Sequence, residues 1–92
     1  MYKVVLTRRY KTALKRVIRR KEFDKRLLEE VVSTLASGSV LDTKYRDHQL
    51  SGELNDRREC HIKHNVLLVY RKRDDVLVLL LIDLGSHDDV FR

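Results

Sequence analysis

The sequence contains no proline, no tryptophan, three glycines and one cysteine, Cys60, among its 92 residues. A lone cysteine forms no internal disulfide, so we expect a reducing compartment, the cytoplasm. The first residues carry no signal-peptide pattern. The longest apolar run, residues 76–82, is too short to cross a bilayer, so no membrane partner is expected. The length fits one domain, residues 1–92, and excludes a two-domain enzyme.

Basic residues outnumber acidic ones, and the excess lies near the start of the chain. Twenty Lys and Arg stand against fourteen Asp and Glu, a formal net charge of +6. Residues 1–26 hold eleven of the basic residues and only two of the acidic ones. This asymmetry favours a polyanionic or acidic partner. With 42% apolar residues, the chain is expected to fold.

Apolar spacing predicts two helices after a short first strand, residues 2–6. Thr7 is a suitable N-cap, and apolar residues then recur at helical spacing over residues 8–21. Asp24 caps a second helix, which Gly38 ends. Solvation and phosphate binding explain the basic face of the first helix about equally well. That face consists of Arg8, Arg9, Lys15, Arg16, Arg19 and Arg20.

The second half of the chain predicts a long ordered loop followed by strands. The loop covers the polar residues 39–56. The order strand, helix, helix, strand, strand, strand indicates an α+β fold, with helices on one face of a mostly antiparallel sheet that ends in a three-strand meander. The apolar run 76–82 suits a central strand buried on both faces. The meander strands are residues 57–62, 66–70 and 76–82, with Arg73-Asp74-Asp75 as the last turn.

Four histidines, His48, His61, His64 and His87, lie outside the helices, in loops or at strand ends. Histidine is the side chain best suited to proton transfer near neutral pH, although a lone histidine is more often a surface or packing residue. No metal site is predicted, because residues three apart on a strand, such as His61 and His64, point to opposite faces. Cys60 alternates with His61, so we expect it in the core rather than in a Cys–His pair.

Basic residues accompany two of the histidines: Arg57 and Arg58 stand shortly before His61, and Lys44 and Arg46 shortly before His48. This combination suits RNA cleavage without a metal or another cofactor. A base takes the proton of the ribose 2′ hydroxyl, and an acid protonates the departing 5′ oxygen. Arginine or lysine stabilises the charge on the phosphorus. DNA lacks the 2′ hydroxyl, so such a site is RNA-specific.

Three segments in order carry a family resemblance: YRDHQLSG at residues 45–52, RECHI at 58–62 with LLVY at 67–70, and GSHDDVF at 85–91. With them the whole chain resembles YafQ-type members of the RelE/ParE toxin superfamily, the toxins of bacterial type II toxin–antitoxin systems. The resemblance implies a RelE-like fold and a ribosome-dependent, metal-independent mRNA endonuclease that a cognate antitoxin neutralises. It implies the ribosome and mRNA as further partners, and promoter DNA only through the antitoxin complex.

The resemblance also implies roles for single residues. His48 and His61 would transfer protons or orient the scissile phosphate, and His87 would be the leading candidate for general acid. Arg58 would hold the phosphate, and Phe91 would stack on or position a base. The sequence leaves open which histidine is the base and which is the acid.

One position departs from the family pattern. The family commonly has Pro-Asp shortly after the strand histidine, and that aspartate belongs to its catalytic set. Here the pair is His64-Asn65. Asparagine forms hydrogen bonds but does not take up a proton as a carboxylate does. His64 is the expected substitute base. A strict pleat also places Arg58 and His61 on opposite faces, so they converge only through a bulge or an early strand end.

Two other functions are compatible with this sequence. The first is a ParE-like toxin that binds DNA gyrase and has no nuclease activity. The second is a catalytically weakened member of the fold that only binds RNA. The histidine set favours the nuclease, because binding to gyrase does not require histidines at these positions.

Overall fold

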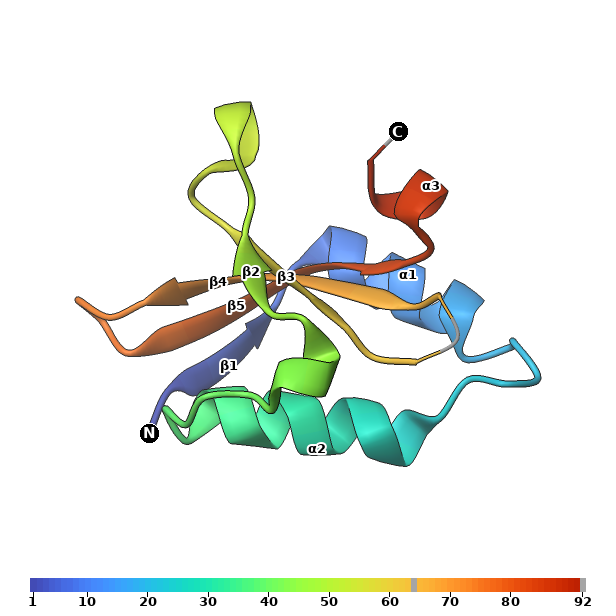
Figure 1. Ribbon diagram of the computed structural model, residues 1–92, viewed down its shortest axis with the longest axis horizontal. Helices are drawn as coiled ribbons and strands as arrows, with labels where there is room; N and C mark the ends of the chain where they lie inside the picture. Colours follow the sequence, from blue (N-terminus) through green and yellow to red (C-terminus); the bar gives the residue numbers. More distant parts are fainter. Residues whose placement is uncertain (64, 92) are drawn as a thin grey trace.

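The computed structural model describes residues 1–63 and 65–91, and in these residues five strands form one mixed sheet (Figure 1). The strand order is β1-β5-β4-β3-β2. Within the same residues, no helix is long and apolar enough to span a membrane. The elements are β1 Lys3–Leu6, α1 Arg8–Val17, α2 Lys25–Ala36, the 3₁₀ turn η1 Thr43–Tyr45, β2 His48–Gln49, the 3₁₀ turn η2 Gly52–Leu54, β3 Arg58–His61, β4 Leu67–Arg73, β5 Val78–Gly85 and α3 His87–Val90.

Side-chain caps begin both long helices, as predicted. The Thr7 hydroxyl accepts a hydrogen bond from the backbone N–H of Tyr10, and the Asp24 carboxylate accepts one from the N–H of Leu27. Gly38 follows the C-cap of α2 with a φ of 85°, a left-handed conformation that costs glycine little. These local signals place the helices correctly.

The first helix is shorter than predicted, because it ends at Val17 rather than at residue 21. Beyond this point, the backbone N–H of Arg20 bonds to the carbonyl of Val17, three residues back, which closes a tighter turn. Ile18 is 45% exposed, and residues 19–22 are all charged. Residues 18–21 therefore provide no buried side chain that would stabilise another turn of the helix.

The two faces of the sheet bury different side chains. Helices α1 and α2 cover one face, which carries the main core. Cys60 is fully buried there, as predicted, and burial raises the pKa of its thiol. The short helix α3 lies on the opposite face (Figure 1), over a small cluster of Leu67, Val69 and Val90 with Leu50, Ile82 and Phe91 packed around it. Two layers therefore flank the sheet, and the second covers only part of it.

The antiparallel meander of β3, β4 and β5 confirms the prediction, but β1 adds a parallel pairing to β5. The predicted last strand, 76–82, is displaced: β5 starts at Val78 and continues to Gly85. Val76 and Leu77 are 56% and 51% exposed in the turn instead. The expected burial on both faces is also wrong, since Leu79 and Leu81 are buried but Val78, Leu80 and Ile82 are only half-buried.

The predicted loop 39–56 contains more regular structure than expected. Both 3₁₀ turns and the two-residue strand β2 lie within it. β2 pairs with β3, with His48 opposite Glu59 and Gln49 opposite Arg58. A strand of two residues is too short to show an alternating pattern, so its position follows only from the partner strand.

The β4–β5 turn contains a leucine in a strained conformation. Leu77 has a φ of 52°, and its side chain is half exposed. We expect Leu77→Gly to raise the free energy of unfolding by about 1 kcal/mol, because glycine adopts this backbone without the steric cost of Cβ. Thermal and urea unfolding measure the change. Val76→Gly, at an exposed neighbour without positive φ, should destabilise, and equal effects of the two variants would contradict the prediction.

Candidate active site

The loop before β2 is tied to the sheet through Asp47. The Tyr70 hydroxyl donates to Asp47 Oδ1 at 2.5 Å, and Arg58 Nε lies 3.3 Å from the same oxygen. Burial, together with the hydrogen bond to Asp47, raises the pKa of Tyr70, so the phenol remains a donor. This anchor sits on the helix-covered face. The next residue, His48, therefore begins β2 in a fixed register.

His48 and His61 meet at one carboxylate, that of Glu59. His48 pairs with Glu59 across β2 and β3, and His61 is two residues further along β3 on the same face. Oε1 of Glu59 lies 3.7 Å from Nε2 of His48 and 3.4 Å from Nε2 of His61. The imidazole rings are 6.2 Å apart between centroids. We call these three residues the His–Glu–His cluster.

Glu59 is unusual because it is buried and only partly satisfied. The residue is 4% exposed, and in the described part of the chain its Oε2 has no hydrogen-bond partner. His48 Nδ1 lies 2.8 Å from the carbonyl oxygen of Arg46, which can only accept, so Nδ1 carries a hydrogen. The other nitrogen, Nε2, then directs its lone pair at the Glu59 carboxylate unless a cation lies between them. The cluster is therefore built to share a cation, and a proton is the simplest one.

The short helix α3 adds His87 and Phe91 to the same face. Glu59 and His61 lie opposite Val69 and Leu67, whose side chains pack with α3. Leu67 in turn pairs with Gly85, so His61 and Gly85, two residues before the start of α3, are two strand spacings, about 10 Å, apart. The rings of His87 and Phe91 are 4.7 Å apart between centroids. His87 is exposed, as a group that meets a bound substrate must be.

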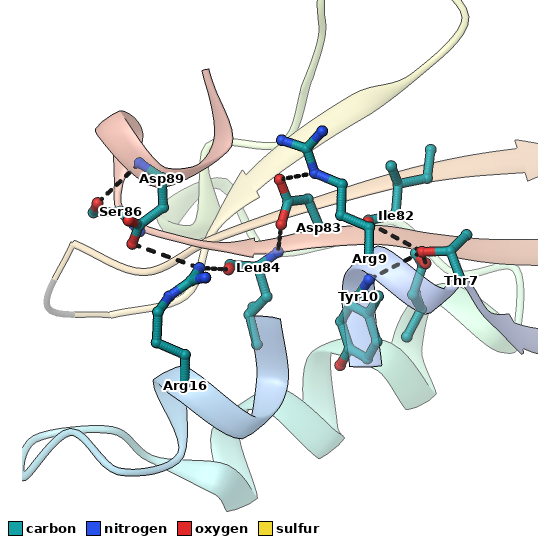
Figure 2. Close-up of polar contacts among 10 residues, drawn as sticks. Thr7, Arg9, Tyr10, Arg16, Ile82, Asp83, Leu84, Ser86 and Asp89 are labelled. Atoms are coloured by element: carbon teal, nitrogen blue, oxygen red, sulfur yellow. Dashed lines mark hydrogen bonds and ion pairs between the residues drawn. The ribbon is translucent and has the colours of Figure 1, made fainter. Parts of the chain in front are cut away.

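Ion pairs from α1 and from the turn that follows it hold α3 in place. Ser86 and Asp89 form a capping box at the start of α3. Asp89 Oδ2 also lies 3.0 Å from Arg20 Nη2 and 3.7 Å from Arg16 Nη2. Figure 2 shows Arg16 between Asp89 and the carbonyl of Leu84, to which it donates at 3.2 Å. Part of the basic helix face is thus neither simply solvated nor free for phosphate.

A cavity of about 200 Å³ lies on the α3 face of the sheet. Arg9 and Arg57 line it together with Phe91, and Arg9 Nε is 2.8 Å from Asp83 Oδ2 at its wall (Figure 2). Arg57 Nε lies 3.1 Å from Asp56. The cavity combines guanidinium groups with an aromatic ring and apolar side chains from Leu50, Leu54, Val69, Ile82 and Val90.

The structure does not bring Arg58 to the histidines. β3 runs in continuous register against β4, with Arg58 opposite Tyr70 and His61 opposite Leu67. Neither a bulge nor an early end of β3 turns the strand, so Arg58 stays on the helix-covered face with Asp47. Arg57, just before β3, lines both the cavity on the α3 face and the pocket that contains Arg58.

The remaining predicted residues lie at the edges of the site. Lys44 is exposed, with Nζ 5.2 Å from the centroid of the Tyr45 ring, and Arg46 is exposed with a left-handed backbone. Asn65 is exposed in the β3–β4 turn with a φ of 61°, which asparagine tolerates better than most residues. His64 lies outside the described residues. The turn geometry thus accounts for an asparagine at position 65.

Glu59 is the site residue that sequence reasoning missed. A signal was present, because Glu59 and His61 are two apart on a predicted strand and must share a face. The expectation of no metal site rested on spacings along the sequence and did not pair residues from two strands. The facing residue from another strand, His48, became visible only through the β2–β3 register.

Asp89 couples the geometry of α3 to pH. Hydrogen bonding from the Ser86 backbone, then from its side chain, and the charges of Arg16 and Arg20 lower the pKa of Asp89. Its contribution to stability is therefore present at neutral pH and is lost as the pH falls through the acidic range, below about pH 5. We expect Asp89→Asn to lower the melting temperature at pH 7. The melting temperature of this variant should also fall less steeply than that of the wild type as the pH becomes acidic. Asp88→Asn, at the exposed neighbour, is the control. The prediction would be contradicted if the melting temperatures of wild type and Asp89→Asn fell equally steeply at acidic pH.

Comparison with known proteins identifies the family. The model for the bacterial toxin of type II toxin–antitoxin system, YafQ, matches residues 2–92. A metal-bound toxin from Helicobacter pylori shares 40% identity over 99% of this chain and 100% of its own, with a TM-score of 0.90. A copper-bound mutant toxin from that organism shares 37%, with the same coverage and TM-score.

The fold also matches a more distant protein. YafQ from E. coli, solved in a DinJ–YafQ complex, shares 19% identity over 100% of both chains, with a TM-score of 0.87. No curated protein sequence matches this chain. The match to the family model over nearly the whole chain shows that it belongs to the YafQ family of toxins from bacterial type II toxin–antitoxin systems.

Proposed function

We propose that this toxin is a ribosome-dependent mRNA endonuclease that needs no metal and that a cognate antitoxin neutralises. One observation supports the nuclease above all: two histidines from neighbouring strands share a buried carboxylate on the sheet face that also carries His87 and Phe91. A gyrase-binding surface has no need for such a cluster. The restriction to ribosome-bound mRNA comes from the family resemblance.

The proposed reaction is a transfer within the RNA strand. The 2′ hydroxyl loses its proton to a base, and its oxygen forms a bond to the adjacent phosphorus. The bond from that phosphorus to the 5′ oxygen breaks, and an acid gives the leaving oxygen a proton. The products are a 2′,3′-cyclic phosphate and a 5′ hydroxyl, so atoms and protons balance without a metal or water.

The geometry suggests how the side chains divide these steps. The His–Glu–His cluster takes the proton, with Glu59 stabilising the imidazolium that results, at 3.4 Å from His61. His87, exposed at the start of α3, gives a proton to the leaving oxygen. Phe91 stacks on a base, and Arg57 in the adjacent cavity stabilises the phosphate. In this arrangement Arg58 acts through Asp47, by holding the loop that carries His48.

In this proposal Glu59 also compensates for the carboxylate that is missing at position 65. Asn65 provides no carboxylate where the family commonly has one, and it lies exposed in a turn. Glu59 supplies a carboxylate directly at the two histidines, with its side chain 5% exposed. In this proposal the strand carboxylate of Glu59 sustains the acid–base chemistry, which does not depend on His64.

The antitoxin is proposed to cover the free edge of β1. Val4 and Leu6 are 39% and 40% exposed there, unusual for large apolar residues of a strand. A cavity of about 350 Å³ beside them is lined mainly by apolar residues of β1 and both long helices. YafQ from E. coli, whose fold is the same, was solved with its antitoxin DinJ. A segment with apolar residues at alternating or helical spacing fits this surface.

Induced expression in a bacterial host tests the whole proposal. We expect growth arrest together with new 5′ ends on a translated mRNA, mapped by primer extension. His87→Ala should abolish both, and co-expression of the cognate antitoxin should restore growth. Arrest that survives His87→Ala without new mRNA ends would instead support a gyrase-binding toxin.

The role of Glu59 gives a sharper prediction. We expect Glu59→Gln to reduce the cleavage rate on programmed ribosomes by about 10²-fold or more, because the amide cannot stabilise a positively charged imidazole. Glu53→Gln, the same exchange at an exposed residue of η2, should leave the rate unchanged. Circular dichroism and thermal melting confirm that both variants fold. A folded Glu59→Gln variant with the wild-type rate would remove Glu59 from the mechanism.

A further inference from the structure

The His–Glu–His cluster has the donor atoms and spacing of a metal site. One atom from each residue, two imidazole nitrogens and a carboxylate oxygen, lie within 4.8 Å of one another. Tetrahedral zinc with bonds of about 2.0–2.2 Å separates its ligand atoms by about 3.3–3.6 Å. The two distances to Glu59 Oε1, 3.4 and 3.7 Å, already approach this value. His48 is half exposed at the sheet edge, so its side chain has room for a small adjustment.

An independent observation points to a bound cation. Glu59 Oε2 is buried, and in residues 1–63 and 65–91 it has no hydrogen-bond partner. A buried carboxylate without partners is costly unless a positive charge compensates it. No Lys or Arg forms an ion pair with Glu59 in the described chain, and the ionisable groups that pair with it there are the two histidines. A cation bound between the three side chains compensates the negative charge of this carboxylate.

The outer contacts favour metal ligation as well. The Nδ1–H of His48 donates to the Arg46 carbonyl, which orients the ring and leaves Nε2 free to bind. Two imidazoles and one carboxylate suit Zn²⁺ and related transition metals better than Mg²⁺ or Ca²⁺, which prefer oxygen ligands alone. Three protein ligands with an exposed histidine leave a fourth position open to solvent.

We infer that His48, Glu59 and His61 bind a divalent transition-metal ion of the zinc class, and that the bound ion switches off RNA cleavage. The inhibitory part rests on the proposed function. A metal at this position occupies the Nε2 lone pairs and the carboxylate that proton transfer requires. The ion and the transferred proton compete for the same atoms, so the loaded toxin is inactive and the stripped toxin is active.

Zinc titration of the full chain tests the site without reference to activity. Metal-stripped protein is titrated with Zn²⁺ by calorimetry at pH 7, and we expect one ion per chain. Glu59→Gln and His61→Ala should each weaken binding by more than about tenfold, because each removes a ligand. Glu53→Gln is the matched control and should bind as the wild type does. Equal Zn²⁺ affinity in wild type, Glu59→Gln and His61→Ala would overturn the site.

Cleavage assays then test the inhibition. Toxin loaded with Zn²⁺ and desalted is added to programmed ribosomes beside stripped toxin. We expect cleavage to fall at least tenfold in the loaded sample and to return after a chelator removes the ion. Full cleavage by toxin that has retained its zinc would overturn the inhibition. If stripped toxin cleaves nothing, the proposed nuclease fails, while the titration still decides the metal site.

Discussion

A buried negative charge, that of Glu59, is the constraint on which the arrangement of the site depends. A carboxylate removed from water needs a positive partner or several hydrogen-bond donors. In the described chain the partners within reach are His48 and His61, one from the facing strand and one from its own. Each of these imidazoles is neutral without, and positively charged with, a second bound proton. The negative charge of Glu59 is therefore compensated only when a cation, such as a proton, binds to the cluster. This property suits the cluster to proton transfer.

The rest of the structure fixes the elements around that charge. Asp47 binds Tyr70 and Arg58 on the opposite face and so sets the register in which His48 enters the sheet. Across the sheet, Arg16 of α1 and Arg20 of the following turn hold Asp89 and with it the short helix that carries His87. A helix of four residues has almost no stability of its own. Its position therefore follows from these ion pairs and from the packing of Val90.

Much of the fold could be predicted from the sequence, because its signals are local. Thr7, Asp24 and Gly38 mark helix ends through their own hydrogen bonds and backbone angles, and the three meander strands follow from apolar runs. Strand alternation also correctly separated Arg58 from His61. The two-residue strand β2, the end of β5 and helix α3 could not be predicted, since long-range pairing and ion pairs create them. Glu59 was missed for the same reason: its partner His48 is eleven positions earlier and meets it only through the strand register.

The position of the carboxylate has a consequence for the chemistry. A carboxylate in an exposed turn, where Asn65 stands, is solvated and interacts weakly with a neighbouring imidazole. Glu59 is buried, and a lower local dielectric strengthens its attraction for any cation placed between the two rings. The same field that stabilises an imidazolium also attracts a divalent ion, and an ion carries twice the charge. In the proposed mechanism the buried carboxylate on the strand therefore stabilises an imidazolium and, by the same physics, attracts a metal ion.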